Sequence, residues 1–471
     1  MNGGKWRGGA GNGGDTVRGG DTVRGGDKVG SHGEGGGNTA PRLSRRGLLG
    51  LAGAGVVGAG IGGAGGAGVA MAVAQSVAPQ SGAAKSYPFF GEHQGGILTP
   101  AQDRLHFAAF DVGDISRAEL VELLTDWTYA ASRMAAGLGA GTYGAASGPY
   151  DSPPDDTGEA LDLPPSGLTI TFGFGPSLFD DRFGLASRRP AALIDLPHFP
   201  GDTLDERLVG GDLCVQACSD DPQIAVHAIR NLSRIAFGRA SLRWSQLGFG
   251  RTSSTTRAQA TPRNLFGFKD GTANMRAEDT ATVTRDVWAQ SGDDTGGTGG
   301  SGGAGGSGGA WMTGGSYLVA RKIRMTVETW DRASLREQET VVGRTKGEGA
   351  PLSGGTEFTK PDFMVTGRAD APLIAPAAHV RLAHPSANAG ANILRRGYNF
   401  VDGNDDLGRL NAGLFFICFQ RDPRTQFVPL QLNLARNDAM NEYVRHVGSG
   451  IFAVPPGATE GSYVGARLFG D

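Results

Sequence analysis

Cysteine is scarce in this sequence, which has three cysteines among 471 residues. So few thiols, and an odd number of them, cannot build the disulfide framework of a small secreted domain. Cys214 and Cys218 lack the partners that a zinc site needs, and Cys418 lies in the apolar run 414–419. We therefore predict that all three are buried packing residues.

A large excess of one charge is also missing, since the formal net charge is −3 and the pI is about 6.3. Such a balance gives no electrostatic reason to expect nucleic acid as the main partner. Glycine, in contrast, is abundant, with 80 residues. Its excess lies before Ala84 and between Ser291 and Gly315, so the rest of the chain has the composition of an ordinary globular protein.

The N-terminal part of the chain predicts a segment without a globular core. Residues 1–43 are rich in glycine and bury too little apolar surface to fold, so we expect a disordered extension. Residues 44–74 combine the paired Arg45 and Arg46 with a weakly hydrophobic stretch that ends at Ala74. This pattern is typical of a cleaved twin-arginine export signal, and it predicts a periplasmic, cell-envelope or extracellular protein. The alternative is a transmembrane anchor, which the many glycines disfavour.

From residue 87 onward the sequence carries alternating strand and helix patterns. Ser116 and Glu119 form a capping-box pattern, behind which apolar residues recur at helical spacing. The predicted order is strand 104–112, a helix from 117, strands 168–174 and 212–219, a helix from 222, and strand 241–249. This is the order of a split βαβ, or ferredoxin-like, unit.

A second series of elements follows residue 262. It predicts strand 317–328, helix 334–342, strand 413–420, a short helix at 437–444 and strand 451–454. We therefore predict an α+β protein with two ferredoxin-like domains and antiparallel sheets, at residues 87–261 and 262–471. Within the second domain, residues 291–309 are almost pure Gly, Ser and Thr and should form a flexible loop.

The stretch Gly-Phe-Lys-Asp-Gly at residues 267–271 places the carboxylate of Asp270 between two glycines. Glycine lets the backbone turn sharply and approach a partner closely, so this geometry can present Asp270 to a buried ligand. An Asp-Gly pair between two extended runs is also typical of a hairpin turn. The segment alone favours this plain alternative.

Two later segments give the motif a chemical context. His379 lies among small apolar residues, and Arg381 follows it. A histidine in such a run is either a metal ligand or, more commonly, a hydrogen-bonded core residue. Arg395 and Arg396 stand in another apolar stretch, and buried arginines need anions. The pattern therefore implies an acidic partner or an anionic cofactor.

Together these motifs resemble the dye-decolourising (DyP-type) haem peroxidase family, and most closely its exported branch, which includes deferrochelatases. The resemblance runs from Gly-Glu-His-Gln at residues 91–94 to residues 448–457. It includes the family signature Gly-x-x-Asp-Gly at 267–271 and the segments 343–346, 378–381, 394–400 and 414–420. The long Gly/Ser loop and the N-terminal extension depart from the family pattern, but neither falls on a motif.

The resemblance implies one haem b per chain in the C-terminal half, with His379 as the proximal ligand of the iron. The other ring nitrogen would donate to Asp438 or Glu442, and the sequence does not choose between these carboxylates. Asp270 would move a proton between the two oxygens of hydrogen peroxide. Arg395 would stabilise the negative charge that develops as the oxygens separate.

Four further residues complete the implied haem site. Arg344 and Arg381 would pair with the haem propionates, and Leu414 and Phe416 would wall the pocket. Structural ion pairing is the alternative for the two arginines, and core packing is the alternative for the two apolar residues.

The implied function is a peroxidase that reduces hydrogen peroxide and oxidises dye-like or other organic donors. One alternative is a deferrochelatase, which releases iron from haem and would act with iron-uptake components. Another is a non-enzymatic haem carrier or sensor, which would not need both Asp270 and Arg395. Family members often self-associate, so a homo-oligomer stays open.

Overall fold

A computed structural model describes residues 85–293 and 309–470. The chain divides into one unit that ends at Pro79 and another that begins at Gln80, and the described residues belong to the second. The predicted N-terminal extension, the export signal and most of the Gly/Ser loop lie outside the described residues. No helix in the described part is long and apolar enough to cross a membrane.

The first half of this unit forms the elements that its sequence predicts. The capping box is complete, since the Ser116 hydroxyl accepts the N–H of Glu119 and the Glu119 carboxylate accepts the N–H of Ser116. Asp221 caps the second helix by accepting the N–H of Gln223. The elements are β1 (Arg104–Val112), α1 (Arg117–Ala135), β2 (Thr169–Phe174), β3 (Leu213–Ser219), α2 (Pro222–Ile235) and β4 (Ala240–Arg251).

The second half contains more elements than the sequence predicts. They are α3 (Thr280–Asp286), β5 (Ser316–Met325), α4 (Val327–Trp330), α5 (Leu335–Val342), α6 (His379–Leu382), β6 (Leu394–Arg395), β7 (Tyr398–Asn404), β8 (Leu410–Gln420), α7 (Phe427–Asn437), β9 (Val444–Val454) and α8 (Ala466–Phe469). The sequence pattern does not predict β7 because its second part, from Val401 to Asn404, is exposed and lacks apolar alternation.

The short helix predicted at residues 437–444 is present only as a 3-10 helix of four residues, Ala439–Glu442. α7 ends at Asn437, and β9 begins at Val444 after one intervening 3-10 turn. Asp438 causes the break because its backbone is extended and its carboxylate accepts the N–H of Met440. This break matters for the site, since Asp438 is one of its residues.

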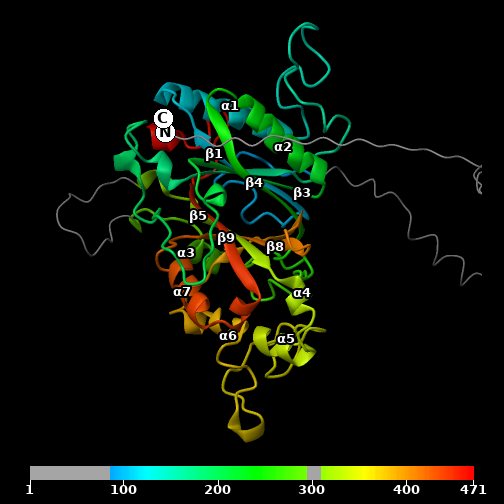
Figure 1. Cartoon of the computed structure of the whole chain (residues 1–471). Helices are drawn as coiled ribbons and strands as arrows, with labels where there is room; N and C mark the ends of the chain where they lie inside the picture. Colours follow the sequence, from blue (N-terminus) through cyan, green and yellow to red (C-terminus); the bar gives the residue numbers. More distant parts are fainter. Residues whose placement is uncertain (1–84, 294–308, 471) are drawn as a thin grey trace, which may run out of the picture. The chain divides into compact units, whose positions relative to one another are not determined.

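The nine strands of the described residues belong to one sheet, in the order β5-β9-β2-β3-β1-β4-β7-β8-β6. Figure 1 shows β1, β3, β4, β5, β8 and β9 of this sheet. A further pairing of β5 with β8 closes the ring, and β6 lies beside β8. The pairings of these strands are antiparallel, which confirms the predicted α+β class with antiparallel strands. Strands from the two halves of the sequence meet where β2 pairs with β9 and where β4 pairs with β7.

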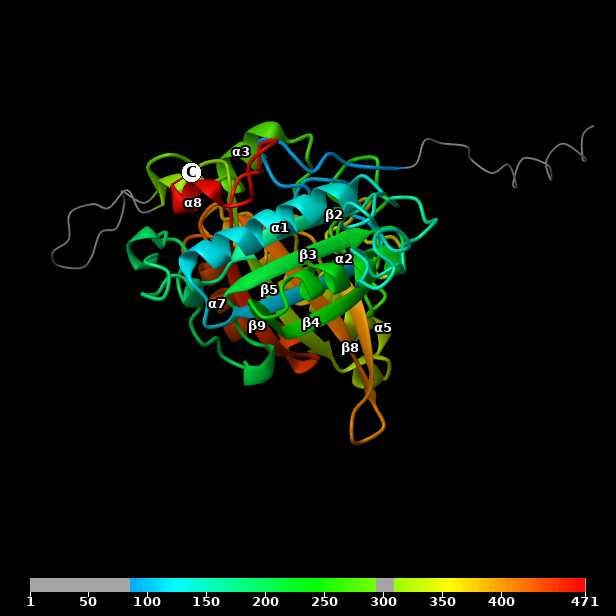
Figure 2. The same cartoon turned by 90° about the horizontal axis from the view of Figure 1, so that it is seen from above.

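Alternate side chains of β1 serve two different cores. Phe107 belongs to the inner core, enclosed by the ring of strands, where its ring lies 5.2 Å from that of Trp244. Phe110 belongs to the outer core and packs against Trp127 of α1 at 5.2 Å. Helices α1 and α2 cover this outer face (Figure 2). Successive side chains of β1 point to opposite faces of the sheet, and both of these faces are buried.

The three cysteines are free and buried, as predicted. Cys214 and Cys218 pack in the inner core, and Cys418 packs in the outer core. Burial raises the pKa of the Cys214 and Cys418 thiols, so these two side chains stay neutral and unreactive.

Candidate functional site

His379 opens the short helix α6 and bonds to a buried carboxylate. Its Nδ1 lies 2.6 Å from Oδ2 of Asp438, whose side chain is 3% exposed. The two segments are also joined by the backbone, since Ala439 N–H donates to the oxygen of Ala377. Glu442, the other predicted carboxylate, is exposed. The structure therefore brings Asp438 to His379.

Opposing effects act on the imidazole of His379. Burial lowers its pKa, whereas the charge and hydrogen bond of Asp438 raise it, and the net result is a pKa above the ordinary value. The contact with the carboxylate places a ring proton on Nδ1. The side chain is 40% exposed, and in the described part of the chain its Nε2 makes no hydrogen bond. This nitrogen is therefore available to an external ligand.

Asp270 and Arg395 form an ion pair near this histidine. Nη1 of Arg395 lies 2.6 Å from Oδ1 of Asp270, and the two side chains are 27% and 13% exposed. The second carboxylate oxygen lies 3.3 Å from Nδ2 of Asn264, which donates to it. The charge of Asp270 raises the pKa of His379 and the charge of Arg395 lowers it. The fold thus brings three residues that are far apart in the sequence into one electrostatic group.

The loop that carries Asp270 depends on its glycines. Gly267 and Gly271 have φ angles of +81° and +87°, which L side chains rarely adopt. A Cβ on Gly271 would also lie 2.9 Å from the Cα of Ser253. The loop does not join two strands of the sheet, because β4 ends at Arg251 and the next element is α3. A small antiparallel hairpin is nevertheless present here, because Arg263 bridges Lys269 and the N–H of Asp270 donates to the oxygen of Pro262, but its turn precedes Asp270.

The predicted propionate partners, Arg344 and Arg381, anchor loops around the site. Nη1 of Arg344 donates to two backbone oxygens in the loop after α5, at 2.7 and 2.9 Å. Nη1 of Arg381 donates to the backbone oxygens of Phe363 and Ile374, at 3.3 and 3.1 Å. Burial lowers the pKa of Arg344, and the charge of Arg395 lowers it further. Arg344 therefore lies within electrostatic reach of the ion pair.

The sequence patterns do not single out Arg276, which is also buried beside the site. Its guanidinium donates to the backbone oxygen of Gly271 at 3.1 Å and to that of Ser254. Burial lowers the pKa of Arg276, and the charge of Arg395 lowers it further. Arg276, Arg344 and Arg395 therefore concentrate positive charge beside the Asp270 loop. The signal in the sequence is the position of Arg276 five residues after the last glycine of the Gly-x-x-Asp-Gly motif.

Leu414 and Phe416 lie on the same face of β8 and are partly exposed. Leu414 packs against the aromatic cluster around Trp330, and the ring of Phe416 lies 6.4 Å from that of Phe427 in α7. The alternate residue Phe415 belongs to the inner core. Both predicted wall residues therefore face outward from the ring of strands and contribute to packing there.

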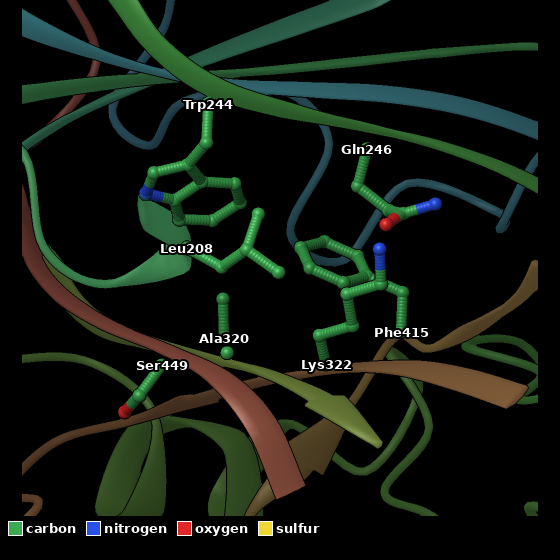
Figure 3. A pocket seen from close by; sticks show the side chains of 8 residues that line it. Leu208, Trp244, Gln246, Ala320, Lys322, Phe415 and Ser449 are labelled. Atoms are coloured by element: carbon green, nitrogen blue, oxygen red, sulfur yellow. The ribbon is translucent and has the colours of Figure 1, made fainter. Parts of the chain in front are cut away.

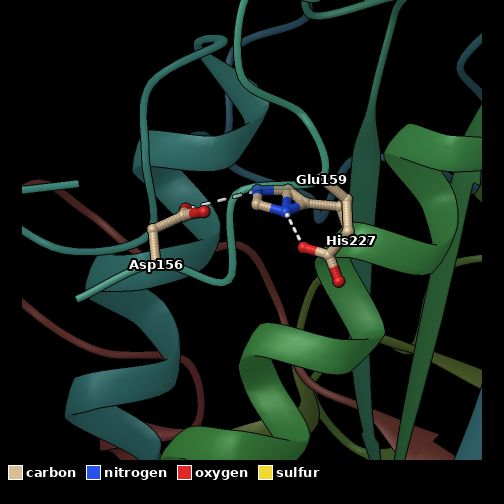
Figure 4. A group of neighbouring side chains, drawn as sticks. All are labelled: Asp156, Glu159 and His227. Atoms are coloured by element: carbon tan, nitrogen blue, oxygen red, sulfur yellow. Dashed lines mark hydrogen bonds and ion pairs between the residues drawn. The ribbon is translucent and has the colours of Figure 1, made fainter. Parts of the chain in front are cut away.

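A separate cluster joins His227 of α2 to Asp156 and Glu159 (Figure 4). Sequence reasoning does not find this cluster, because its members lie in different segments. The Nε2 and Nδ1 of His227 lie 3.3 Å from Asp156 and from Glu159, respectively. One ligand atom from each residue lies within 4.8 Å of the others. Asp156 also accepts the N–H of Ala140, and Glu159 pairs with Arg230, so we interpret the cluster as an anchor between a loop and α2.

A small hollow opens between β4, β5 and β8, and Trp244, Gln246, Lys322 and Phe415 contribute to its lining (Figure 3). Its polar groups already have partners in the protein. Lys322 and Gln246 contact Asp402 at 2.6 and 3.1 Å, and the indole N–H of Trp244 donates to a backbone oxygen. None of the predicted site residues lines this hollow, so the candidate site is the group around His379.

Comparison with known proteins covers most of the chain. The family models "Dyp-type peroxidase, N-terminal" and "Dyp-type peroxidase, C-terminal" match residues 94–250 and 261–459. A deferrochelatase of Yersinia pseudotuberculosis is 35% identical over 380 residues, which are 80% of this chain and 83% of that protein. A deferrochelatase of Escherichia coli K12 is 36% identical over 388 residues, which are 81% of this chain and 86% of that protein.

Solved structures agree with these matches. Ferric DtpA from Streptomyces lividans has a TM-score of 0.74 and 41% identity, with 84% of this chain and all of that chain covered. A DyP-type peroxidase from Streptomyces coelicolor has a TM-score of 0.73 and 42% identity, with 82% and 97% covered. Family models, relatives and structures therefore lead to one conclusion: this chain belongs to the Dyp-type peroxidase family.

Proposed function

We propose that the protein is a haem-dependent peroxidase that reduces hydrogen peroxide and oxidises a dye-like or other organic donor. The observation that carries this proposal is the proximity of the His379–Asp438 pair to the Asp270–Arg395 ion pair. The first pair suits a metal ligand, and the second suits acid–base chemistry. A haem carrier needs the first pair only.

The side chains around His379 fit a haem group. A histidine that donates from Nδ1 to a carboxylate presents its Nε2 lone pair to iron in a fixed orientation. The two propionates of haem are anionic, and Arg276, Arg344 and Arg395 supply positive charge next to the site. We assign Arg344 and Arg381 to the propionates. We assign Leu414 and Phe416 to the apolar wall, because both lie partly exposed on one face of β8.

Bound haem supplies the iron that activates hydrogen peroxide and passes its oxidising equivalents to the donor. Asp270 accepts a proton from one peroxide oxygen and returns it to the other as the bond between them breaks. Arg395 donates N–H groups to the oxygen on which negative charge develops. Asp438 orients His379 and makes its imidazole a stronger electron donor.

The reaction can be tested on the purified mature protein after it has been loaded with haem. We expect an absorption spectrum of histidine-ligated haem, a fast spectral change on addition of hydrogen peroxide, and oxidation of an organic dye with turnover. A spectrum that does not respond to peroxide would contradict the assignment. Haem-loaded serum albumin, which lacks this site, is the control for non-specific dye oxidation.

Deferrochelatase activity is the second candidate, because relatives with that name match about four fifths of this chain. It would consume haem as a substrate, and release of iron would leave a fluorescent metal-free porphyrin. The same peroxide experiment separates the two functions. A peroxidase keeps its haem through many turnovers, whereas a deferrochelatase accumulates porphyrin and free iron in proportion to the haem supplied.

We also propose export through the twin-arginine pathway, on the basis of the sequence pattern at residues 44–74. This pathway carries folded proteins, so the chain would acquire haem before it crosses the membrane. Changing both Arg45 and Arg46 to Lys should leave the full-length precursor inside the cell, as measured by immunoblotting of cell fractions. The matched control changes Arg42 to Lys, outside the pair. Normal export of the double variant would contradict the proposal.

A further inference from the structure

Within the described residues, the peptide of Arg395 has no neighbouring strand on one side. β6 contains only Leu394 and Arg395 and pairs with β8 on its other side, where the N–H of Arg396 donates to the oxygen of Ile417. In an antiparallel ladder, alternate residues point their N–H and C=O in opposite directions. The N–H and C=O of Arg395 therefore point away from β8.

The side-chain amide of Asn274 occupies this open side. Its Oδ1 accepts the N–H of Arg395 at 2.8 Å, and its Nδ2 donates to the oxygen of Arg395 at 2.9 Å. One amide thus makes the two hydrogen bonds that a neighbouring strand would make. Asn274 is 7% exposed, so water does not readily replace it.

Asn274 is also fixed to the loop that carries Asp270. Its backbone N–H donates to the oxygen of Gly271 at 3.0 Å, and its Nδ2 also donates to the buried oxygen of Ser254 at 3.0 Å. The backbone of Arg395 is therefore held at a set position relative to Asp270. The ion pair between their side chains does not ensure this alone, because it joins one guanidinium nitrogen to one oxygen and the arginine side chain is 27% exposed.

We propose that Asn274 is a positioning residue that holds the backbone of Arg395 in register with Asp270. Without it, the short strand β6 can shift or twist, and the arginine no longer meets the oxygen on which charge develops. Its effect on the reaction rests on the proposed function. The position of the Arg395 backbone relative to Asp270 does not depend on haem, so it can be tested in the haem-free protein.

The first measurement is hydrogen exchange at the Arg395 amide in the haem-free protein. Asn274→Ala should speed this exchange at least about tenfold, because the amide loses its acceptor. The amide of Arg396, which donates to β8, should change less than about threefold. Unchanged exchange at Arg395 in Asn274→Ala would overturn the proposal.

The second measurement is the rate of the haem-loaded protein with hydrogen peroxide. Asn274→Ala should lower this rate by about 10- to 100-fold, as expected when a catalytic group is misplaced by about 1 Å. The matched control is Asn399→Ala, since Asn399 is 5% exposed and its Nδ2 donates to the backbone oxygen of Gly250 and not to that of Arg395. It should lower the rate less than about threefold, as expected away from the reacting groups.

A double-mutant cycle tests whether Asn274 acts through Arg395. If it does, adding Asn274→Ala to Arg395→Leu should slow the peroxide reaction no further. If the rate of the double variant instead falls by the product of the two single effects, Asn274 has a general structural role and the proposal is overturned. If the wild type does not react with peroxide, the proposed function fails. Hydrogen exchange at Arg395 would then decide the positioning role by itself.

Discussion

Asp270→Asn is expected to slow the reaction with hydrogen peroxide by about 10²–10⁴-fold. Asparagine keeps the shape of the side chain and an oxygen that can accept from Arg395, but it is not a base at neutral pH. The proton of peroxide then has no nearby acceptor in the position that Asp270 holds, 2.6 Å from Arg395. Stopped-flow absorbance of the haem-loaded protein measures the rate.

Arg395→Leu and Asp402→Asn complete this experiment. Arg395→Leu should also slow the reaction while haem stays bound, because it removes charge stabilisation but not the iron ligand. Asp402 pairs with Lys322 at 2.6 Å outside the site, so Asp402→Asn should leave the rate unchanged. If Asp270→Asn reacts as fast as the wild type and Arg395→Leu does not, the arginine is the main catalyst. We also expect dye oxidation to work best in mildly acidic solution, where proton delivery is easier.

His379→Ala is expected to abolish most haem binding. The substitution removes the iron ligand and leaves the carboxylate of Asp438, which is 3% exposed, without its imidazole partner. A buried charge that loses its partner disfavours the folded site as well. Haem titration, followed by absorbance and by the haem content of the purified protein, measures the loss.

Two milder substitutions separate ligation from support of the ligand. Asp438→Asn should keep haem bound but alter its spectrum and redox potential, because the carboxylate that makes the imidazole electron-rich is gone. Glu442→Gln should have no effect, since Glu442 is exposed. Full haem occupancy with an unchanged spectrum in His379→Ala would contradict the assignment of His379 as the ligand.

The sequence predicts local structure well where one short-range signal dominates. The capping box at Ser116 and the alternation on β1 give the element bounds of the first half nearly to the residue. The predicted bounds are less accurate at residues 437–444, where Asp438 caps a 3-10 helix of only four residues. The carboxylate of Asp438 both caps this helix and bonds to His379. Apolar periodicity alone cannot predict either contact.

The motifs predict which residues belong to the site, but not which of them are in contact. The contact of Asp438 with His379 requires the actual path of the chain after α7, so sequence leaves Glu442 as an equal alternative. Arg276 and Asn274 contribute through hydrogen bonds to backbone atoms of distant segments, and no spacing rule encodes such contacts. The order of the strands in the ring could not be predicted for the same reason, because it depends on pairing between distant segments.

The closed ring of strands also determines when its strands can pair during synthesis of the protein. β2 leaves the ribosome early, but its partner β9 lies near the end of the chain, as the pairing of Phe174 with Ala453 shows. The edge of β2 that pairs with β9 therefore stays unpaired until β9 has been translated. Pairing between such distant segments is slow, and exposed edges promote aggregation. Cells that produce this protein should consequently depend on chaperones that bind unfinished sheets, and a premature stop codon before Val444 should yield insoluble fragments rather than a smaller working enzyme.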